Sequence, residues 1–254
     1  MIHAVAGLVA AAVMTACAST TSPLQSPVAE VSPVELSSRS SEKALGLEVI
    51  ELVLADPDRT IVAPVHVIGS EQQQDRLAGS GCHVASVDAQ YIMEFLGACE
   101  PLLRRSSSWH GQLPSWRPLL QRRVDPGGVE VTIDGRIESL VGGVVTLLHR
   151  AWSQPTERGT VLYVELLPVH HAHEDGRLHL LGMKEASPRQ IFPEAGLDVE
   201  ISPQRGIVIS GRALVRRAVG TGLGGGVPGV VQWLLEPPGL PPRRRVLVLI
   251  ADTH

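Results

Sequence analysis

From Val129 to Ala251 the chain repeats short β-branched segments separated by Gly, Pro and Asp-Gly pairs. Val129, Val131 and Ile133 alternate with polar residues, as in a strand that is buried on one face. Asp134-Gly135 follows, a pair typical of two-residue hairpin turns. Further strands are expected at Gly143–Trp152, Thr160–Pro168, Leu197–Ile201, Ile207–Ser210 and Arg245–Ala251. Strand following strand predicts a mainly β (α+β) fold with antiparallel sheets rather than an alternating α/β fold.

The part of the chain before Val129 gives weaker signals. Ala44–Ala55 fits either a strand or a short helix, because Glu48 and Glu51 leave its period ambiguous. Thr60–Ile68 is β-branched and predicts a strand, which Pro64 restricts to an edge or a bulge. The other expectations are a loop at Glu71–Ser80, a helix at Asp88–Leu96 and a long excursion at Pro101–Pro118.

The composition favours an aliphatic core and argues against one class of partner. Aromatic residues make up only 3% of the chain, whereas Val and Leu are abundant, and valine favours sheets. The net charge of −4 is spread over segments of mixed sign. No basic stripe interleaved with aromatic residues is present in the sequence, so nucleic acid is not the expected partner.

The first 17 residues resemble a bacterial lipoprotein signal. Ala4–Ala16 carries no charged side chain and is too short for a bilayer, which needs ~20 residues. Met14-Thr15-Ala16-Cys17 resembles a lipobox. The resemblance implies cleavage before Cys17, diacylglycerol on its sulfur and acyl chains such as palmitate in a membrane leaflet. The alternative is an ordinary secretory signal or a misassigned start, because no Lys or Arg precedes the apolar run.

This signal divides the chain into three expected parts. Residues 1–16 form the signal peptide, residues 17–43 a Ser/Thr/Pro-rich tether and residues 44–254 a single β-rich domain. The resemblance places the protein in the bacterial cell envelope, lipid-anchored, with its domain in the periplasm. Ala18 stands where an Asp would favour retention at the inner membrane, so the outer membrane is the expected location.

Two further cysteines, Cys82 and Cys99, remain if Cys17 carries a lipid. An even pair in an oxidising compartment predicts a disulfide, which would stabilise the fold by ~3 kcal/mol in the chain-entropy model. Two buried free thiols are the alternative, because nothing in the sequence places the two Cα atoms close together.

A histidine-rich segment is the strongest candidate for chemistry. His171, His173 and Asp175 have a spacing that resembles the first metal motif of metallo-β-lactamase-fold hydrolases. Such a loop could hold zinc and activate a water molecule, although a solvated loop that is merely rich in histidine fits as well. Gly220–Gly226 satisfies a G-x-G-x-x-G pattern but is followed by Val227-Pro228, which favours a flexible loop over a phosphate site. The sequence contains no Gly-x-Ser-x-Gly elbow.

In the C-terminal half, Thr160–Leu181 combines a strand, a proline and an Asp-Gly pair. This pattern resembles the secretin domain of type II and type III secretion systems and of pilus systems. Arg205–Gly211 is similar to its "dG..vvigGl" strand pair, and Val227–Leu234 partly matches its "vP..g..P" segment. Arg243–Ile250 is similar to the final "eLlilitP" strand. The resemblance implies envelope protein partners and is compatible with an oligomer; whether the protein is also an enzyme stays open at this point.

The sequence therefore predicts a membrane-anchored envelope lipoprotein that acts as a structural or interaction component, as a divergent secretin-like part of a secretion or pilus assembly. The interaction role needs no cofactor and assigns no catalytic residue. The alternative function is a zinc-dependent envelope metallohydrolase that uses His171, His173 and Asp175.

Overall fold

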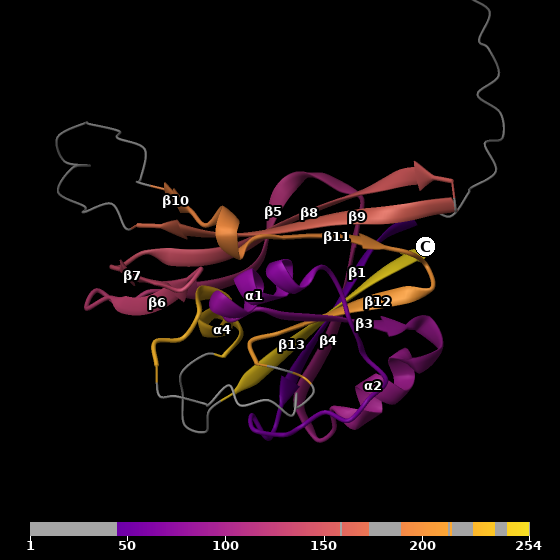
Figure 1. The fold of residues 1–254 in the computed structure, drawn as a ribbon, viewed down its shortest axis with the longest axis horizontal. Helices are drawn as coiled ribbons and strands as arrows, with labels where there is room; N and C mark the ends of the chain where they lie inside the picture. The colour runs from indigo at the N-terminus through magenta and orange to yellow at the C-terminus, as the bar shows by residue number, and fades with distance from the viewer. Residues whose placement is uncertain are drawn as a thin grey trace, which may run out of the picture. The chain divides into compact units, whose positions relative to one another are not determined.

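A six-stranded sheet forms the centre of the fold (Figure 1). The computed structural model describes residues 45–157, 159–172, 189–212, 214, 226–236 and 243–253. The sheet has the order β2-β3-β12-β13-β1-β4, and all its strands pair antiparallel. Its strands are β1 (Leu45–Leu54), β2 (His66–Val67), β3 (His83–Asp88), β4 (Leu102–Gly111), β12 (Arg205–Ser210) and β13 (Arg244–Thr253).

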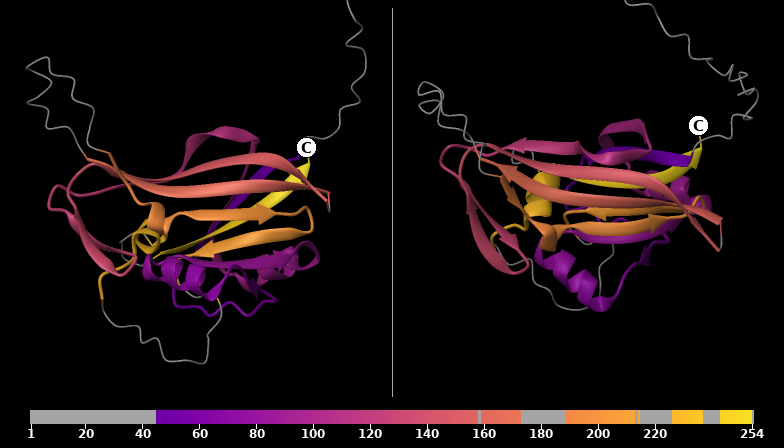
Figure 2. Two further views of the ribbon diagram at one scale, coloured as in Figure 1. Left: turned by 45° about the horizontal axis from the view of Figure 1, so that its top comes forward. Right: turned by 90° about the horizontal axis from the view of Figure 1, so that it is seen from above.

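A second sheet of five antiparallel strands packs against the first (Figure 2). It has the order β10-β9-β8-β5, and β11 pairs with β9 beside β10. Its strands are β5 (Leu113–Arg123), β8 (Val144–Thr156), β9 (Gly159–His171), β10 (Arg189–Ile191) and β11 (Leu197–Ile201). A separate hairpin consists of β6 (Val129–Ile133) and β7 (Arg136–Leu140). The mainly β fold with antiparallel sheets that the sequence predicted is thus confirmed.

Few helices complete the described part of the chain. The α-helices are α1 (Glu71–Gly79), α2 (Ile92–Ala98) and α4 (Val230–Leu235), and the 3-10 helices are η1 (Ala89–Tyr91) and η2 (Pro193–Ala195). Within the described ranges, none of these helices is long and apolar enough to cross a bilayer.

The six-stranded sheet is buried on both faces. On one face Leu47, Leu249 and Ile207 belong to a large hydrophobic cluster that continues into Val145 and Val164 of the five-stranded sheet. The opposite face is covered by α2 and by the segment after β1, which form a second hydrophobic cluster with it. Its members include Ile50, Leu52, Leu54, Val87, Phe95, Val208, Val246 and Val248. Alternate residues of one strand therefore serve two separate cores, which explains the nearly continuous apolar run in β13.

The β6–β7 hairpin confirms the turn that the sequence predicted. Ile133 pairs with Arg136, so Asp134 and Gly135 form a two-residue loop. Both residues have positive φ, 47° and 75°, which Asp-Gly pairs adopt more readily than other residues do. Local chemistry alone was sufficient to predict this element.

Ser80 joins the hairpin, α1 and α4. Its Oγ accepts a hydrogen bond from the Asp134 backbone N–H at 3.1 Å, and its carbonyl accepts from the Val231 N–H at 3.1 Å. Gly229, immediately before α4, lies so close that a Cβ built on it would be 2.1 Å from the Ser80 carbonyl carbon. Only glycine permits this approach, and the three elements depend on it.

Two sequence predictions are wrong. The polar segment Glu71–Ser80 forms α1 rather than a loop; Ser70 caps the helix by accepting the Gln73 N–H at 3.2 Å, and only Leu77 is buried. The expected excursion at Pro101–Pro118 instead contains β4 and most of β5. Both strands lie at sheet edges and are largely exposed, so their side chains lack the alternation that marks a half-buried strand.

The other first-half elements follow the sequence more closely. Ala44–Ala55 is a strand, β1, and the helical spacing at Asp88–Leu96 corresponds to η1 and α2. The strand expected at Thr60–Ile68 shrinks to the two residues of β2, at the sheet edge where Pro64 restricted it.

Candidate functional site

The predicted metal-binding residues are only partly within the described chain. His171 is the last residue of β9 and pairs with Arg189 of β10 across the ladder. Burial and the nearby Arg189 lower the pKa of His171. His173 and Asp175 lie outside the described residues, as does the predicted lipidation site Cys17. Among the residues the structure describes, no cluster of three or more His, Cys, Asp or Glu is arranged to hold a metal ion.

The structure does not bring Cys82 and Cys99 together. Cys82 belongs to the cluster between the sheets, whereas Cys99 belongs to the cluster on the opposite face of the six-stranded sheet. Both are buried free thiols, the second of the two alternatives left open by the sequence. Burial raises the pKa of Cys82 to about 12 and that of Cys99 to about 11, which makes both unreactive at neutral pH.

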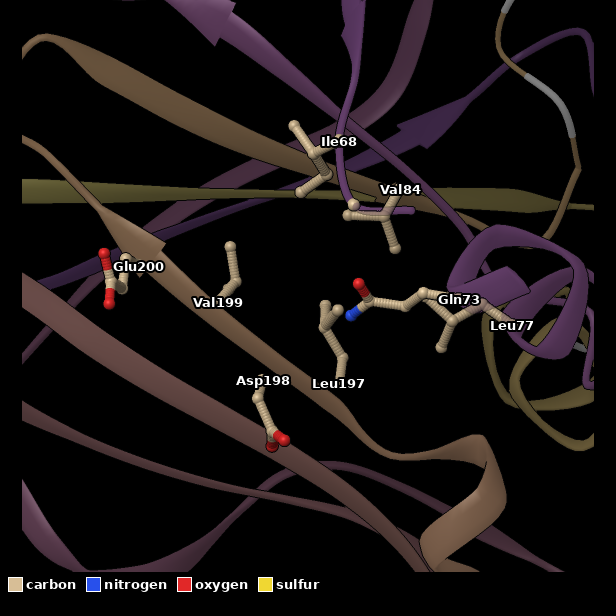
Figure 3. A pocket seen from close by; sticks show the side chains of 9 residues that line it. Ile68, Gln73, Leu77, Val84, Leu197, Asp198, Val199 and Glu200 are labelled. Carbon is tan, nitrogen blue, oxygen red and sulfur yellow. The ribbon is translucent and has the colours of Figure 1, made fainter. Parts of the chain in front are cut away.

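An apolar slot lies between the edge strand β11 and helix α1, with a volume of about 230 Å³ (Figure 3). Its walls include Leu197 and Val199 of β11 on one side and Leu77 and Val84 on the other, and Gln73 extends from α1 toward Leu197. Small-molecule sites are usually larger, ~300–1,000 Å³. The slot is better matched to a few aliphatic side chains.

The strand that borders the slot has an open edge. β11 pairs with β9 on one side, and none of the described strands pairs with its other side. Leu197 and Ile201 point inward and are buried, whereas Asp198 and Glu200 are exposed. This edge therefore combines a backbone side that no described strand pairs with and a largely apolar slot, which Asp198 and Glu200 also line.

A wider groove of about 610 Å³ lies along β5 and α4. Arg122 in this groove has a structural role, because it contacts the end of α4. The Arg122 guanidinium lies 3.6 Å from the centroid of the Trp233 ring. It donates hydrogen bonds to the carbonyls of Trp233 and Glu236 at the end of α4. Burial lowers the pKa of Arg122 to about 10. A cation at a helix C-terminus stabilises the helix, which accounts for this residue.

A chain of hydrogen bonds links the two sheets where β4 passes into β5. Ser108 Oγ lies 2.9 Å from His110 Nε2, and His110 Nδ1 lies 3.2 Å from His149 Nε2. His149 Nδ1 in turn lies 2.9 Å from the Arg117 carbonyl oxygen. Ser108 and His110 are two residues apart on β4 and share one face, whereas His149 comes from β8. The two imidazole rings are nearly perpendicular, at 89°.

The Arg117 carbonyl determines how protons are arranged along this chain. A carbonyl only accepts, so His149 Nδ1 carries the hydrogen and a neutral His149 accepts at Nε2. His110 must therefore donate from Nδ1, which leaves its Nε2 to accept from the Ser108 hydroxyl. Burial, and the neighbouring His110, lower the pKa of His149 to about 4; burial lowers that of His110 as well. Both rings are accordingly neutral at pH 7.

Solvent exposure increases along this series of hydrogen bonds, from His149 through His110 to Ser108. His149 is fully buried at 0% exposure, His110 is half-buried and Ser108 is exposed. None of the three residues was predicted as a site residue. Ser108 and His110 lie in the segment that was expected to be irregular, whereas His149 lies in the strand expected at Gly143–Trp152. The spacing of Ser108 and His110 places their side chains on one face only if the segment is a strand, so it indicates a site only when that strand is known. His149 lies 39 residues from His110, and nothing local connects them.

Comparison with known proteins adds no assignment to this geometry. No protein-family model matches the chain. No curated protein and no solved structure matches it either. The secretin-like and lipoprotein-like features of the sequence therefore remain predictions.

Proposed function

We propose that this protein is a membrane-anchored envelope lipoprotein that acts by binding other proteins, as a secretin-like component of a secretion or pilus assembly. The open edge of β11 is its docking site. The observation that carries the proposal is the combination found there, an unpaired strand edge next to an apolar slot. An edge strand of this kind accepts an additional strand from a partner.

The chemistry of the edge specifies the partner segment. In an added strand, alternate side chains point to opposite faces. Those beside Leu197 and Val199 would enter the slot and must be aliphatic. Those beside Asp198 and Glu200 would meet two exposed carboxylates and are best basic. The proposed partner is therefore an extended segment in which aliphatic and basic residues alternate.

A short peptide of alternating Lys and Val tests the docking site on the full chain in detergent. We expect saturable binding by fluorescence polarisation. The same peptide with alternate backbone N-methyl groups keeps its side chains but loses half of its backbone donors, and we expect it not to bind. Equal affinity for the two peptides would rule out strand addition at β11.

Variants of the protein test the charge pattern. Asp198→Lys combined with Glu200→Lys should weaken binding about tenfold, the value expected for two modest ion pairs. Glu130→Lys combined with Glu157→Lys, at two other exposed glutamates, makes the same change in net charge; this is the matched control and should leave the affinity unchanged. An effect of equal size in the control would mean that only net charge matters.

The anchor and the assembly are tested separately. Mass spectrometry of the mature N-terminus should find a diacylglyceryl-modified Cys17, and Cys17→Ser should release the protein from membranes. Detergent-resistant multimers on a gel would support the secretin-like assembly. A clean monomer would argue against a channel.

The alternative metallohydrolase has less support. Arg189 lies across the ladder from His171, and a neighbouring guanidinium opposes binding of a divalent cation there. No metal or cofactor enters the proposed role.

A further inference from the structure

We propose that Ser108, His110 and His149 form an acyl-transfer site that hydrolyses small carboxylic esters. Ser108 is the nucleophile, His110 the general base and His149 a positioning residue. The inference stands independently of the docking site at β11, which involves other residues on another strand. It rests on three successive contacts of 2.9, 3.2 and 2.9 Å, from the Ser108 hydroxyl to the Arg117 carbonyl.

These contacts have the order that nucleophilic catalysis requires. A serine becomes reactive when a base within hydrogen-bond reach takes its proton and a third group holds that base in the correct tautomer. The Arg117 carbonyl fixes His149, and His149 fixes His110 with its free Nε2 toward Ser108. The Ser108 Oγ is also 3.5 Å from the Val49 carbonyl, a longer contact that competes weakly for the proton.

β4 is an edge strand, and none of the described strands pairs with its side away from β1. A substrate carbonyl can therefore approach the backbone beside Ser108 from that side. Backbone N–H groups next to a nucleophile can stabilise the oxyanion of a tetrahedral intermediate.

The reaction proceeds in two balanced halves. As Ser108 Oγ attacks the ester carbonyl carbon, its proton moves to His110 Nε2; the intermediate then collapses, the bond to the leaving alcohol breaks, and His110 returns the proton to that alcohol. A water molecule attacks the acyl-serine, gives its proton to His110, and releases the carboxylic acid as Ser108 regains the proton. No oxidant, metal or second substrate besides water is needed.

The exposure of Ser108 indicates the substrate class. Its side chain is on the surface and lines neither of the two cavities. Neither the slot nor the wider groove is placed to hold a long acyl chain attached to Ser108, so small acyl groups such as acetyl are the expected substrates. The leaving alcohol remains in solvent and is not strongly selected.

The test uses p-nitrophenyl acetate with the full chain in detergent. We expect a burst of p-nitrophenol and, by mass spectrometry, an acetyl group on Ser108. Ser108→Ala should abolish the burst. The matched control is Ser107→Ala: Ser107 is the adjacent serine, directed to the other face of β4, where it donates to Glu48 at 2.5 Å. This control should retain full activity. An unchanged rate in Ser108→Ala, or acetyl only on other residues, would overturn the proposal.

Two histidine series separate catalysis from folding. His110→Gln keeps hydrogen-bonding capacity but removes the base, and should lower kcat/KM about 10²–10⁴-fold. At the buried position, His149→Gln retains an acceptor toward His110 and a donor toward the Arg117 carbonyl, so it should preserve most of kcat. His149→Leu should lower kcat with little change in KM. Equal activity of the Gln and Leu variants, with both folded by circular dichroism, would exclude a positioning role for His149.

Discussion

The indole ring of Trp109 covers Gly46 so closely that a Cβ built on Gly46 would lie 2.6 Å from the ring atoms Cη2 and Cζ2. The same Cβ would lie 2.6 Å from the Gly111 Cα, so the backbone of β4 also closes this space. The contact occurs where the register between β1 and β4 shifts, between the Leu47 and Glu48 pairs. A bulge and a glycine thus allow one aromatic side chain to cover the neighbouring strand.

Replacement of Gly46 by Ala should therefore destabilise the protein. The indole could rotate away, but the Gly111 backbone cannot move without shifting β4. We expect a loss of about 1–3 kcal/mol in the free energy of unfolding, as for other overpacked sites. Urea unfolding followed by tryptophan fluorescence measures it. Gly97→Ala is the control, because nothing lies within 4 Å of a Cβ built there. A Gly46→Ala protein as stable as the wild type would contradict this packing.

Stability should depend on pH through His149. The unfolded chain binds a proton near the ordinary pKa of 6.5, whereas the buried His149 does so only near 4. The stabilisation from the neutral ring is therefore complete above about pH 6.5 and lost as the pH falls toward 4, an effect of about 3 kcal/mol. The lowered pKa values of His83 and His110 act in the same direction. His149→Gln should reduce the slope of the unfolding free energy against pH between about pH 4 and 6.5. An unchanged slope would mean that other groups cause the pH dependence of stability.

Removal of the Arg122 side chain should destabilise α4 and the strand beneath it. Arg122→Ala loses the stacking on Trp233 and the hydrogen bonds to two carbonyls, for an expected cost of about 2–4 kcal/mol. Arg122→Lys keeps the charge but not the planar group, and should recover less than half of that loss. Arg123→Ala, at the exposed next position, should change stability by less than about 0.5 kcal/mol. Equal losses at positions 122 and 123 would refute the capping role.

Thiol titration distinguishes free cysteines from a disulfide. In a Cys17→Ser variant, Cys82 and Cys99 are the two remaining cysteines. The native protein should react with neither, because both thiols are buried and their pKa values are about 12 and about 11. Unfolding without reductant should expose both thiols to the reagent. If neither reacts until a reductant is added, the two cysteines are bonded.

Sequence patterns predicted two kinds of element. One kind is a turn that its own residues determine, and the other is a strand whose apolar residues show which of its faces are buried. Asp134-Gly135 required no tertiary information, and the apolar run of β13 reflected a strand buried on both faces. Helix α1 was not predicted, because Leu77 is its single buried residue and one apolar residue does not form the periodic apolar stripe of an amphipathic helix. Its cap was nevertheless readable, since Ser70 precedes Gln73 by three residues and accepts its N–H.

The candidate sites were harder to predict for a different reason. Ser108 and His110 are close in sequence, but their partner His149 is placed by the packing of one sheet on the other. The slot next to β11 likewise depends on where α1 lies. Such sites are made by contacts between distant segments, whereas Asp134-Gly135 is a local signal. The histidine-rich segment drew attention by composition, although only its first predicted ligand, His171, lies in the described chain.

The position of β13 has a consequence for how this protein is made. β13 separates β1 from β12, and Leu45 pairs with Thr253, so the central sheet joins segments about 200 residues apart. Contacts between such distant segments form slowly. Until β13 has been synthesised, β1 and β12 each lack an inner neighbour and expose an apolar edge. The central sheet can therefore close only after synthesis of β13, and until then the unpaired edges of β1 and β12 favour aggregation.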